Sequence, residues 1–170
     1  MASYALTVLG HDRPGIVAEV TEAIADLGGN LEDSTMTLLR GHFAMTLIAD
    51  VAGTAEDIAA RLVPLSDSGL VVSVRELPPA DAAADERQRY LLTVHGGDRP
   101  GIVSAVARRI ADLGGNITDL STRLVDGFYV LVAEVQLLPE RTEQAQHALR
   151  EAAADLGVTV HFTEVDEDVM

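Results

Sequence analysis

One short stretch with the residue types of a ligand site occurs twice in the chain. It reads GHDRPGIV at residues 10–17 and GGDRPGIV at residues 96–103. In each copy an acidic and a basic side chain precede a Pro-Gly pair, and an apolar segment follows. Proline suits the first turn of a helix because its nitrogen has no hydrogen to leave unpaired. Glycine lets a ligand or another backbone come close. We therefore expect each copy to open a helix beside a small binding site.

The chemistry of such a site would be the recognition of a small zwitterion. The first amides of a helix have no partner within it, and this end carries roughly half a positive charge, which favours a carboxylate or phosphate. Asp12 can cap the helix or accept a hydrogen bond from an ammonium group. Asn30 and Asn116, the only asparagines, follow the Gly-Gly pairs that end these helices and offer both a donor and an acceptor. A free amino acid fits this set of groups.

A purely structural interpretation of the same residues stays open. Asp-x-Pro-Gly is a common helix start, and Gly-Gly-Asn is a common helix end. Arg13 and Arg99 can simply pair with nearby acids at the surface. Because duplication copies caps as faithfully as sites, the repetition alone does not decide between the two interpretations.

The composition argues against several other classes of chemistry. The 170 residues contain no Cys and no Trp, and all twelve basic residues are Arg, so thiolate nucleophiles and Schiff-base lysines are excluded. The five histidines form no H-x-x-x-H pattern, and we expect no metal site, no cofactor and no catalytic residue. A net charge of -15 opposes direct contact with nucleic acid or an anionic membrane. With no apolar run of membrane-spanning length and no signal-peptide pattern, we expect a cytoplasmic protein.

The repeat extends far beyond the loop and predicts two domains. When the chain is shifted by 86 residues, 19 of the 27 positions in 4–30 are identical to those in 90–116. We expect a first domain at residues 1–77, a linker at 78–88 and a second domain at 89–170. The linker sequence begins with two prolines and becomes polar and Ala-rich, which is typical of a connector, although a short helix is an alternative.

Hydrophobic periodicity predicts the same order of elements, βαββαβ, in both domains. The expected elements are strand 4–9, helix 14–27, a hairpin of 31–39 and 41–51, helix 54–67 and strand 70–75, then strand 90–95, helix 100–113, a hairpin of 117–125 and 128–137, helix 142–155 and strand 158–164. This order predicts the α+β class, with two ferredoxin-like units that each carry two helices on one face of a four-stranded antiparallel sheet. Because such small units leave sheet edges bare, we also expect a homodimer.

The motif G-x-D-R-P-G-I-V, followed by I-A-x-L-G-G-N, resembles the ACT domain family of ligand-binding regulatory modules. Two such units with little else look like the glycine cleavage system transcriptional repressor group of tandem ACT proteins. The resemblance implies that an amino acid, glycine or serine, binds at the loop between the first strand and first helix, against a neighbouring unit. The positions that match are His11, Asp12, Arg13, Pro14, Gly15, Ile16 and Asn30, with Gly97, Asp98, Arg99, Pro100, Gly101, Ile102 and Asn116 in the second copy.

The copies differ where His11 stands against Gly97, so the two sites can differ in affinity or ligand, or one alone can be used. The resemblance implies a non-enzymatic regulatory protein that binds a small amino acid and modulates a partner protein, such as a transcriptional regulator of amino-acid metabolism. One alternative is a ligand-independent protein-interaction module with vestigial sites. A weaker alternative is a small enzyme that uses His11 with Asp12.

Overall fold

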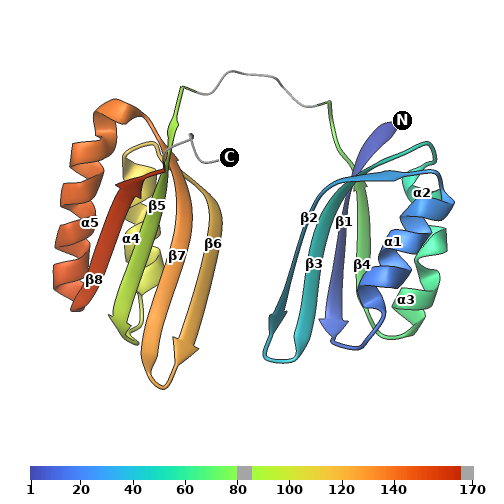
Figure 1. Cartoon of the computed structure of the whole chain (residues 1–170), viewed down its shortest axis with the longest axis horizontal. Helices are drawn as coiled ribbons and strands as arrows, with labels where there is room; N and C mark the ends of the chain where they lie inside the picture. The colour runs from blue at the N-terminus through green and yellow to red at the C-terminus, as the bar shows by residue number, and fades with distance from the viewer. Residues whose placement is uncertain (80–85, 166–170) are drawn as a thin grey trace. The chain divides into compact units, whose positions relative to one another are not determined.

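The computed structural model describes residues 1–79 and 86–165 of the chain. Two compact units divide it, residues 1–82 and 83–170. In each unit the helices cover one face of a sheet (Figure 1). The α+β class and the two ferredoxin-like units are confirmed. The short helix considered for the linker falls on residues outside the described part.

Each unit has the predicted order of elements, and its first strand is four residues longer than periodicity indicates. The first unit contains β1 (Ala2–His11), α1 (Ile16–Asp26), β2 (Asn30–Leu39), β3 (His42–Val51), α2 (Ala55–Arg61), α3 (Val63–Asp67) and β4 (Val71–Glu76). The second contains β5 (Gln88–Gly97), α4 (Ile102–Asp112), β6 (Asn116–Val125), β7 (Phe128–Leu137), a 3₁₀ turn (Pro139–Arg141), α5 (Thr142–Leu156) and β8 (Val158–Glu164).

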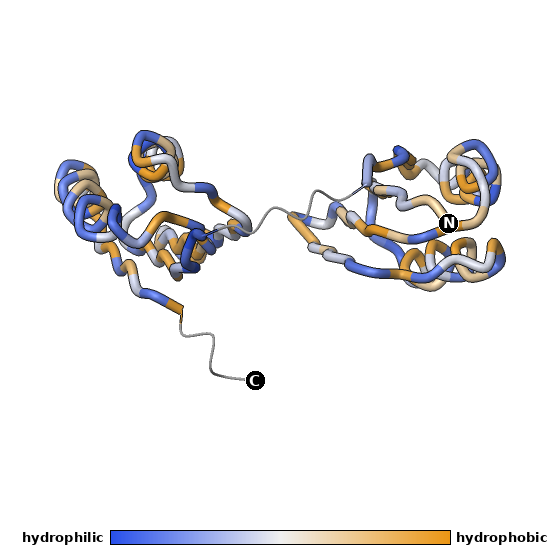
Figure 2. The backbone as a smooth tube through the Cα atoms, turned by 90° about the horizontal axis from the view of Figure 1, so that it is seen from above, coloured by the Kyte–Doolittle hydropathy of each residue, from blue (hydrophilic) through white to orange (hydrophobic). Residues whose placement is uncertain are grey.

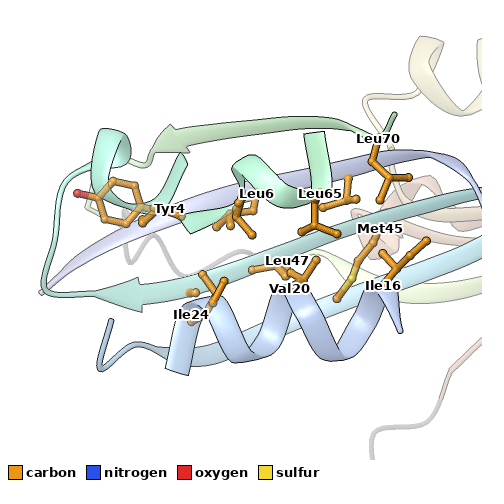
Figure 3. Packing of buried hydrophobic residues seen from close by; sticks show 14 of the residues in the cluster. Tyr4, Leu6, Ile16, Val20, Ile24, Met45, Leu47, Leu65 and Leu70 are labelled. Carbon is orange, nitrogen blue, oxygen red and sulfur yellow. The ribbon is translucent and has the colours of Figure 1, made fainter. Parts of the chain in front are cut away.

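The two sheets have the same topology and the same kind of core. Their strand orders are β2-β3-β1-β4 and β6-β7-β5-β8, and every neighbouring pair is antiparallel. Alternate residues of β1 point toward the helices, so that Tyr4, Leu6 and Val8 are buried. Ile16 and Val20 of α1 pack against this face (Figure 3). Hydrophobic and hydrophilic positions alternate along the elements of both units (Figure 2).

Both predicted hairpin turns are confirmed. Arg40 and Gly41 have φ angles of 50° and 82°, and Asp126 and Gly127 have φ angles of 52° and 79°. Two consecutive positive φ angles match a type I′ turn, whose twist suits the flanking strands.

The predicted helix 54–67 is instead two helices, α2 and α3, which meet at Leu62. Pro64 explains the break, because it has no amide hydrogen to donate and its ring clashes with the carbonyl of the residue four positions earlier. The corresponding helix of the second unit, α5, contains no proline and is continuous over 15 residues.

Candidate functional site

The two Asp-Arg-Pro-Gly segments form equivalent loops at one end of each sheet. We call residues 12–15 the first loop and residues 98–101 the second loop; they join β1 to α1 and β5 to α4 (Figure 1). Each loop is held against the hairpin turn of its own unit. The amide of Asp12 donates to the Gly41 carbonyl at 3.1 Å, and the amide of Asp98 donates to the Gly127 carbonyl at 3.3 Å. The backbone at the start of each loop is therefore fixed.

Both helices begin two residues later than the sequence predicts, at Ile16 and Ile102. Their N-cap residues are Gly15 and Gly101, with φ angles of 94° and 93°, and no side chain caps either helix. The expectation that Asp12 caps a helix starting at Pro14 is wrong, because the left-handed glycine interrupts the helical backbone after the proline. Few residues other than glycine adopt this conformation without strain.

The first backbone amides of these helices remain available. In each helix the first internal hydrogen bond closes onto the N-cap carbonyl, from Glu19 to Gly15 and from Ala105 to Gly101, at 2.9 Å in both. Within the described residues, the amides of Ile16 and Val17 have no acceptor, nor do those of Ile102 and Val103. These amides form the positive end of a helix dipole and can donate to an anion.

An ion pair joins Arg13 of the first loop to Glu19 in the first turn of α1. The Arg13 guanidinium donates to both carboxylate oxygens of Glu19, from Nη1 to Oε1 at 2.6 Å and from Nη2 to Oε2 at 2.8 Å. Nη1 also donates to the Pro14 carbonyl, and Nη2 to the Ser68 hydroxyl, both at 3.3 Å. The hydrogen-bonded guanidinium lowers the pKa of the Glu19 carboxyl, and Glu19 in turn raises the pKa of Arg13. The surface ion pair considered for Arg13 is thus present.

The second loop borders a hollow of about 360 Å³. Its lining comprises Asp98, Arg99, Gly101, Ile102, Val103, Ser104 and Tyr129. The Arg99 guanidinium packs over Gly157 at the end of α5; a Cβ on that glycine would lie 3.5 Å from Cζ. Asp98 and Arg99 bring a carboxylate and a guanidinium to one hollow beside unpaired amides. Such a set of groups can bind both ends of a zwitterion.

Not every predicted site residue contributes a side chain. Ile16 and Ile102 are buried in the cores, so only their backbone faces the loops. Pro14 and Pro100 are exposed within the loops. The His11 ring lies beside the His42 ring, with centroids 4.9 Å apart and planes tilted by 32°, at a position where the second unit has Gly97.

The structure does not bring Asn30 to the loop of its own unit. Asn30 pairs with Asp50, which lies opposite Ser3 near the start of β1, whereas the loop follows His11 at the other end of that strand. Eight strand residues separate the two levels, roughly 26 Å at the usual rise per residue. Asn116 occupies the equivalent place at the start of β6. One small ligand cannot contact both the loop and the asparagine of the same unit.

Sequence reasoning missed four residues beside the loops: Glu19 and Ser68 in the first unit, and Ser104 and Tyr129 in the second. A signal for three of them was present in the repeat. At the 86-residue offset, Glu19 and Phe43 align with Ala105 and Tyr129, and an alanine aligns with Ser104. The two copies therefore differ at these three positions beside a loop whose Asp-Arg-Pro-Gly sequence is identical in both.

Residues 1–79 and 86–165 contain no group of three His, Cys, Asp or Glu side chains able to hold a metal ion. The helices in this part of the chain are too short or too polar to cross a lipid bilayer.

Comparison with known proteins decides the family. The sequence model of the ACT domain matches residues 5–71 and 88–163, one match in each unit. The chain belongs to the ACT domain family. ACT domains are regulatory modules that bind small ligands, amino acids among them, and often dimerise. The resemblance inferred from the loop motif, including the tandem arrangement, is confirmed.

Individual relatives match either one ACT unit or the whole chain. A UPF0237 protein of Methanococcus maripaludis is 33% identical over 75 residues, which cover 44% of this chain and 83% of that protein. The crystal structure of an unknown protein from Galdieria sulphuraria has a TM-score of 0.84 at 27% identity and covers 97% of this chain and 99% of that one. A structure described as a "putative glycine cleavage system transcriptional repressor" has a TM-score of 0.69 at 18% identity, covering 98% of both chains, and shows the shared fold.

Proposed function

We propose that this tandem ACT protein is a non-enzymatic sensor that binds a small amino acid at the loop between the first strand and first helix of a unit. The observation that carries the proposal is the hollow beside the second loop. There, unpaired helix amides, the Arg99 guanidinium and the Asp98 carboxylate border one space.

The charges of these groups are complementary to an amino acid. A carboxylate can accept hydrogen bonds from the amides of the first helical turn and from Arg99, since both are donors and the helix end is positive. The ammonium group can donate to Asp98, which has no hydrogen-bond donor among the described residues. A hollow of about 360 Å³ has room for glycine, serine or a larger amino acid, so the choice of glycine or serine as first ligands to test comes from the family resemblance.

The regulatory output would pass to a partner protein. A net charge of -15 opposes direct binding to DNA, so control of transcription would act through another regulator. The glycine cleavage repressor description of one structural relative supports this kind of role. A ligand can change the affinity of this protein for a partner only if it binds the free and the partner-bound forms with different affinities. The coupling free energy between two such binding events is typically about 1–3 kcal/mol.

A thermal-shift screen tests the proposal. Each of the twenty amino acids at millimolar concentration is added to the whole chain, and at least one small amino acid should raise the unfolding temperature. The double variant Asp12→Ala/Asp98→Ala should lose this stabilisation because the ammonium group loses its acceptor. Asp112→Ala removes one carboxylate at the exposed end of α4, outside both loops, and should keep the stabilisation.

The absence of any stabilisation by all twenty amino acids would reject the sensor. It would favour the alternative, a protein-interaction module with vestigial loops. Exposed apolar side chains on the edge strands support that alternative, among them Leu38 and Leu39 on β2 and Leu124 and Val125 on β6.

A further inference from the structure

The arginine of the first loop already holds a carboxylate of its own chain. Arg13 and Glu19 form two parallel hydrogen bonds of 2.6 and 2.8 Å, the fork geometry in which arginine binds a carboxylate ligand. The pair lies over the N-cap glycine, since a Cβ on Gly15 would be 3.4 Å from Oε1 of Glu19 and 3.9 Å from Nη1 of Arg13. Glu19 therefore occupies the place at the helix start that a bound carboxylate would need.

The second loop lacks this internal carboxylate. The residue equivalent to Glu19 is Ala105, and the described residues offer Arg99 no acidic partner and no hydrogen-bond acceptor. Near the N-cap Gly101, a Cβ would find only the Ser104 hydroxyl within 4 Å, at 3.8 Å. The same loop backbone thus presents an unpaired guanidinium in one unit and a neutralised one in the other.

Two other differences make the second loop more polar. Tyr129 lines the hollow and is half-buried, whereas its counterpart Phe43 is buried in the first core. The Tyr129 hydroxyl has no partner among the described residues and can donate to a ligand. Ser104 replaces an alanine on the rim of the hollow.

We infer that the two ACT units are functionally unequal: Arg99 of the second loop is the arginine that receives the ligand carboxylate, and Glu19 closes the first loop by taking its place on Arg13. This inference rests on the proposed function for the identity of the ligand. The claim that Glu19 blocks the first loop does not depend on the ligand; it rests on the Arg13–Glu19 hydrogen bonds and on their absence at Arg99 among the described residues.

Arginine reactivity tests the inference in the whole chain. Phenylglyoxal, which modifies accessible guanidinium groups, is added, and modification of each arginine is followed over time by mass spectrometry of Asp-N peptides. Arg99 should react severalfold faster than Arg13. In Glu19→Ala, which copies the second loop, Arg13 should accelerate toward the rate of Arg99. Glu22→Ala removes an exposed acid from the same helix and should leave Arg13 slow.

The reciprocal variant, Ala105→Glu, should build the same closure in the second loop and slow Arg99 severalfold. Circular dichroism of both variants checks that they remain folded. Equal rates for Arg13 and Arg99 in the unmodified chain, or no change in either arginine in the two variants, would overturn the inference.

Repeating the phenylglyoxal reaction in the presence of glycine distinguishes failure of this inference from failure of the proposed function. Glycine at millimolar concentration should protect Arg99 and leave Arg13 unprotected, and Glu19→Ala should make Arg13 protectable. Protection of neither arginine, with the difference in rates intact, would reject glycine as the ligand and leave the closure by Glu19 standing. Equal rates with equal protection of both arginines would reject the closure and support ligand binding in both units.

Discussion

At the scale of single residues, one substitution between the copies changes what an otherwise identical loop can do. Asp, Arg, Pro and Gly recur in the same order in both loops, and the φ angles of the two N-cap glycines are 94° and 93°. Glu19 against Ala105 decides whether the loop arginine is neutralised. The shared motif therefore gives both loops the same backbone, whereas Glu19, a neighbour outside the motif, determines whether the loop arginine is paired.

The Arg13–Glu19 pair should make the stability of the first unit depend on pH. Arg13 lowers the pKa of Glu19 in the folded protein. The pair therefore stabilises the fold above the unfolded pKa of about 4.3, and this contribution is lost as the pH falls through the lower, folded pKa. Compared with Glu19→Gln, the unmodified chain should have the higher free energy of unfolding at pH 7, and the difference should shrink in acid.

Urea denaturation of both proteins at several pH values between neutral and strongly acidic measures this difference. A difference that stays constant down to the lowest pH would show that the charge of Glu19 contributes nothing. Other titrating groups, such as Asp57, whose pKa is lowered by hydrogen bonds from Thr54, are present in both proteins and cancel.

At the scale of elements, the left-handed glycine at each helix start positions the amides of the candidate site. Gly101→Ala should destabilise the protein by about 1–2 kcal/mol, because alanine is strained at a φ of 93°. Gly97→Ala is the matched control, since its Cβ would meet no atom within 4 Å and its φ lies outside the left-handed range. Urea denaturation measures both changes, and equal effects would show that the helix start tolerates a side chain.

The elements themselves follow from sequence periodicity, whereas the start of the helix does not. Alternation along β1 and the stripe of Ile16 and Val20 on α1 predict a strand and a helix, and both are confirmed. Periodicity carries no information on φ, so the Pro-Gly pair suggested a helix from Pro14. Gly15 instead adopts a positive φ and moves the start to Ile16.

The candidate site was predictable only in part, because the sequence shows which residues are neighbours along the chain but not which ones the fold brings together. The loop residues are adjacent in sequence, so their proximity needed no knowledge of the fold. The place of Asn30 directly after the helix predicts that it lies near the loop, yet the helix returns the chain to the opposite end of the sheet. Tyr129 reaches the hollow from β7, through strand pairing that the sequence does not specify.

At the scale of the whole molecule, duplication supplies two copies of one fold with separate cores. Each core lies within its own unit, so a residue beside one loop, such as Glu19, can differ from its counterpart without disturbing the core of the other unit. The net charge of -15 opposes direct contact of the chain with nucleic acid. A sensor with one open loop and one closed loop would take one ligand per chain.

Chemical-shift mapping tests this account most directly. Amide resonances of the ¹⁵N-labelled whole chain are followed during a titration with glycine and, separately, with L-serine. We predict saturable shifts that are largest at Ile102, Val103 and Ser104, with small shifts at Ile16 and Val17. Saturable shifts centred away from both loops, or none with either amino acid, would contradict the claim that the second loop is the site of an amino-acid sensor.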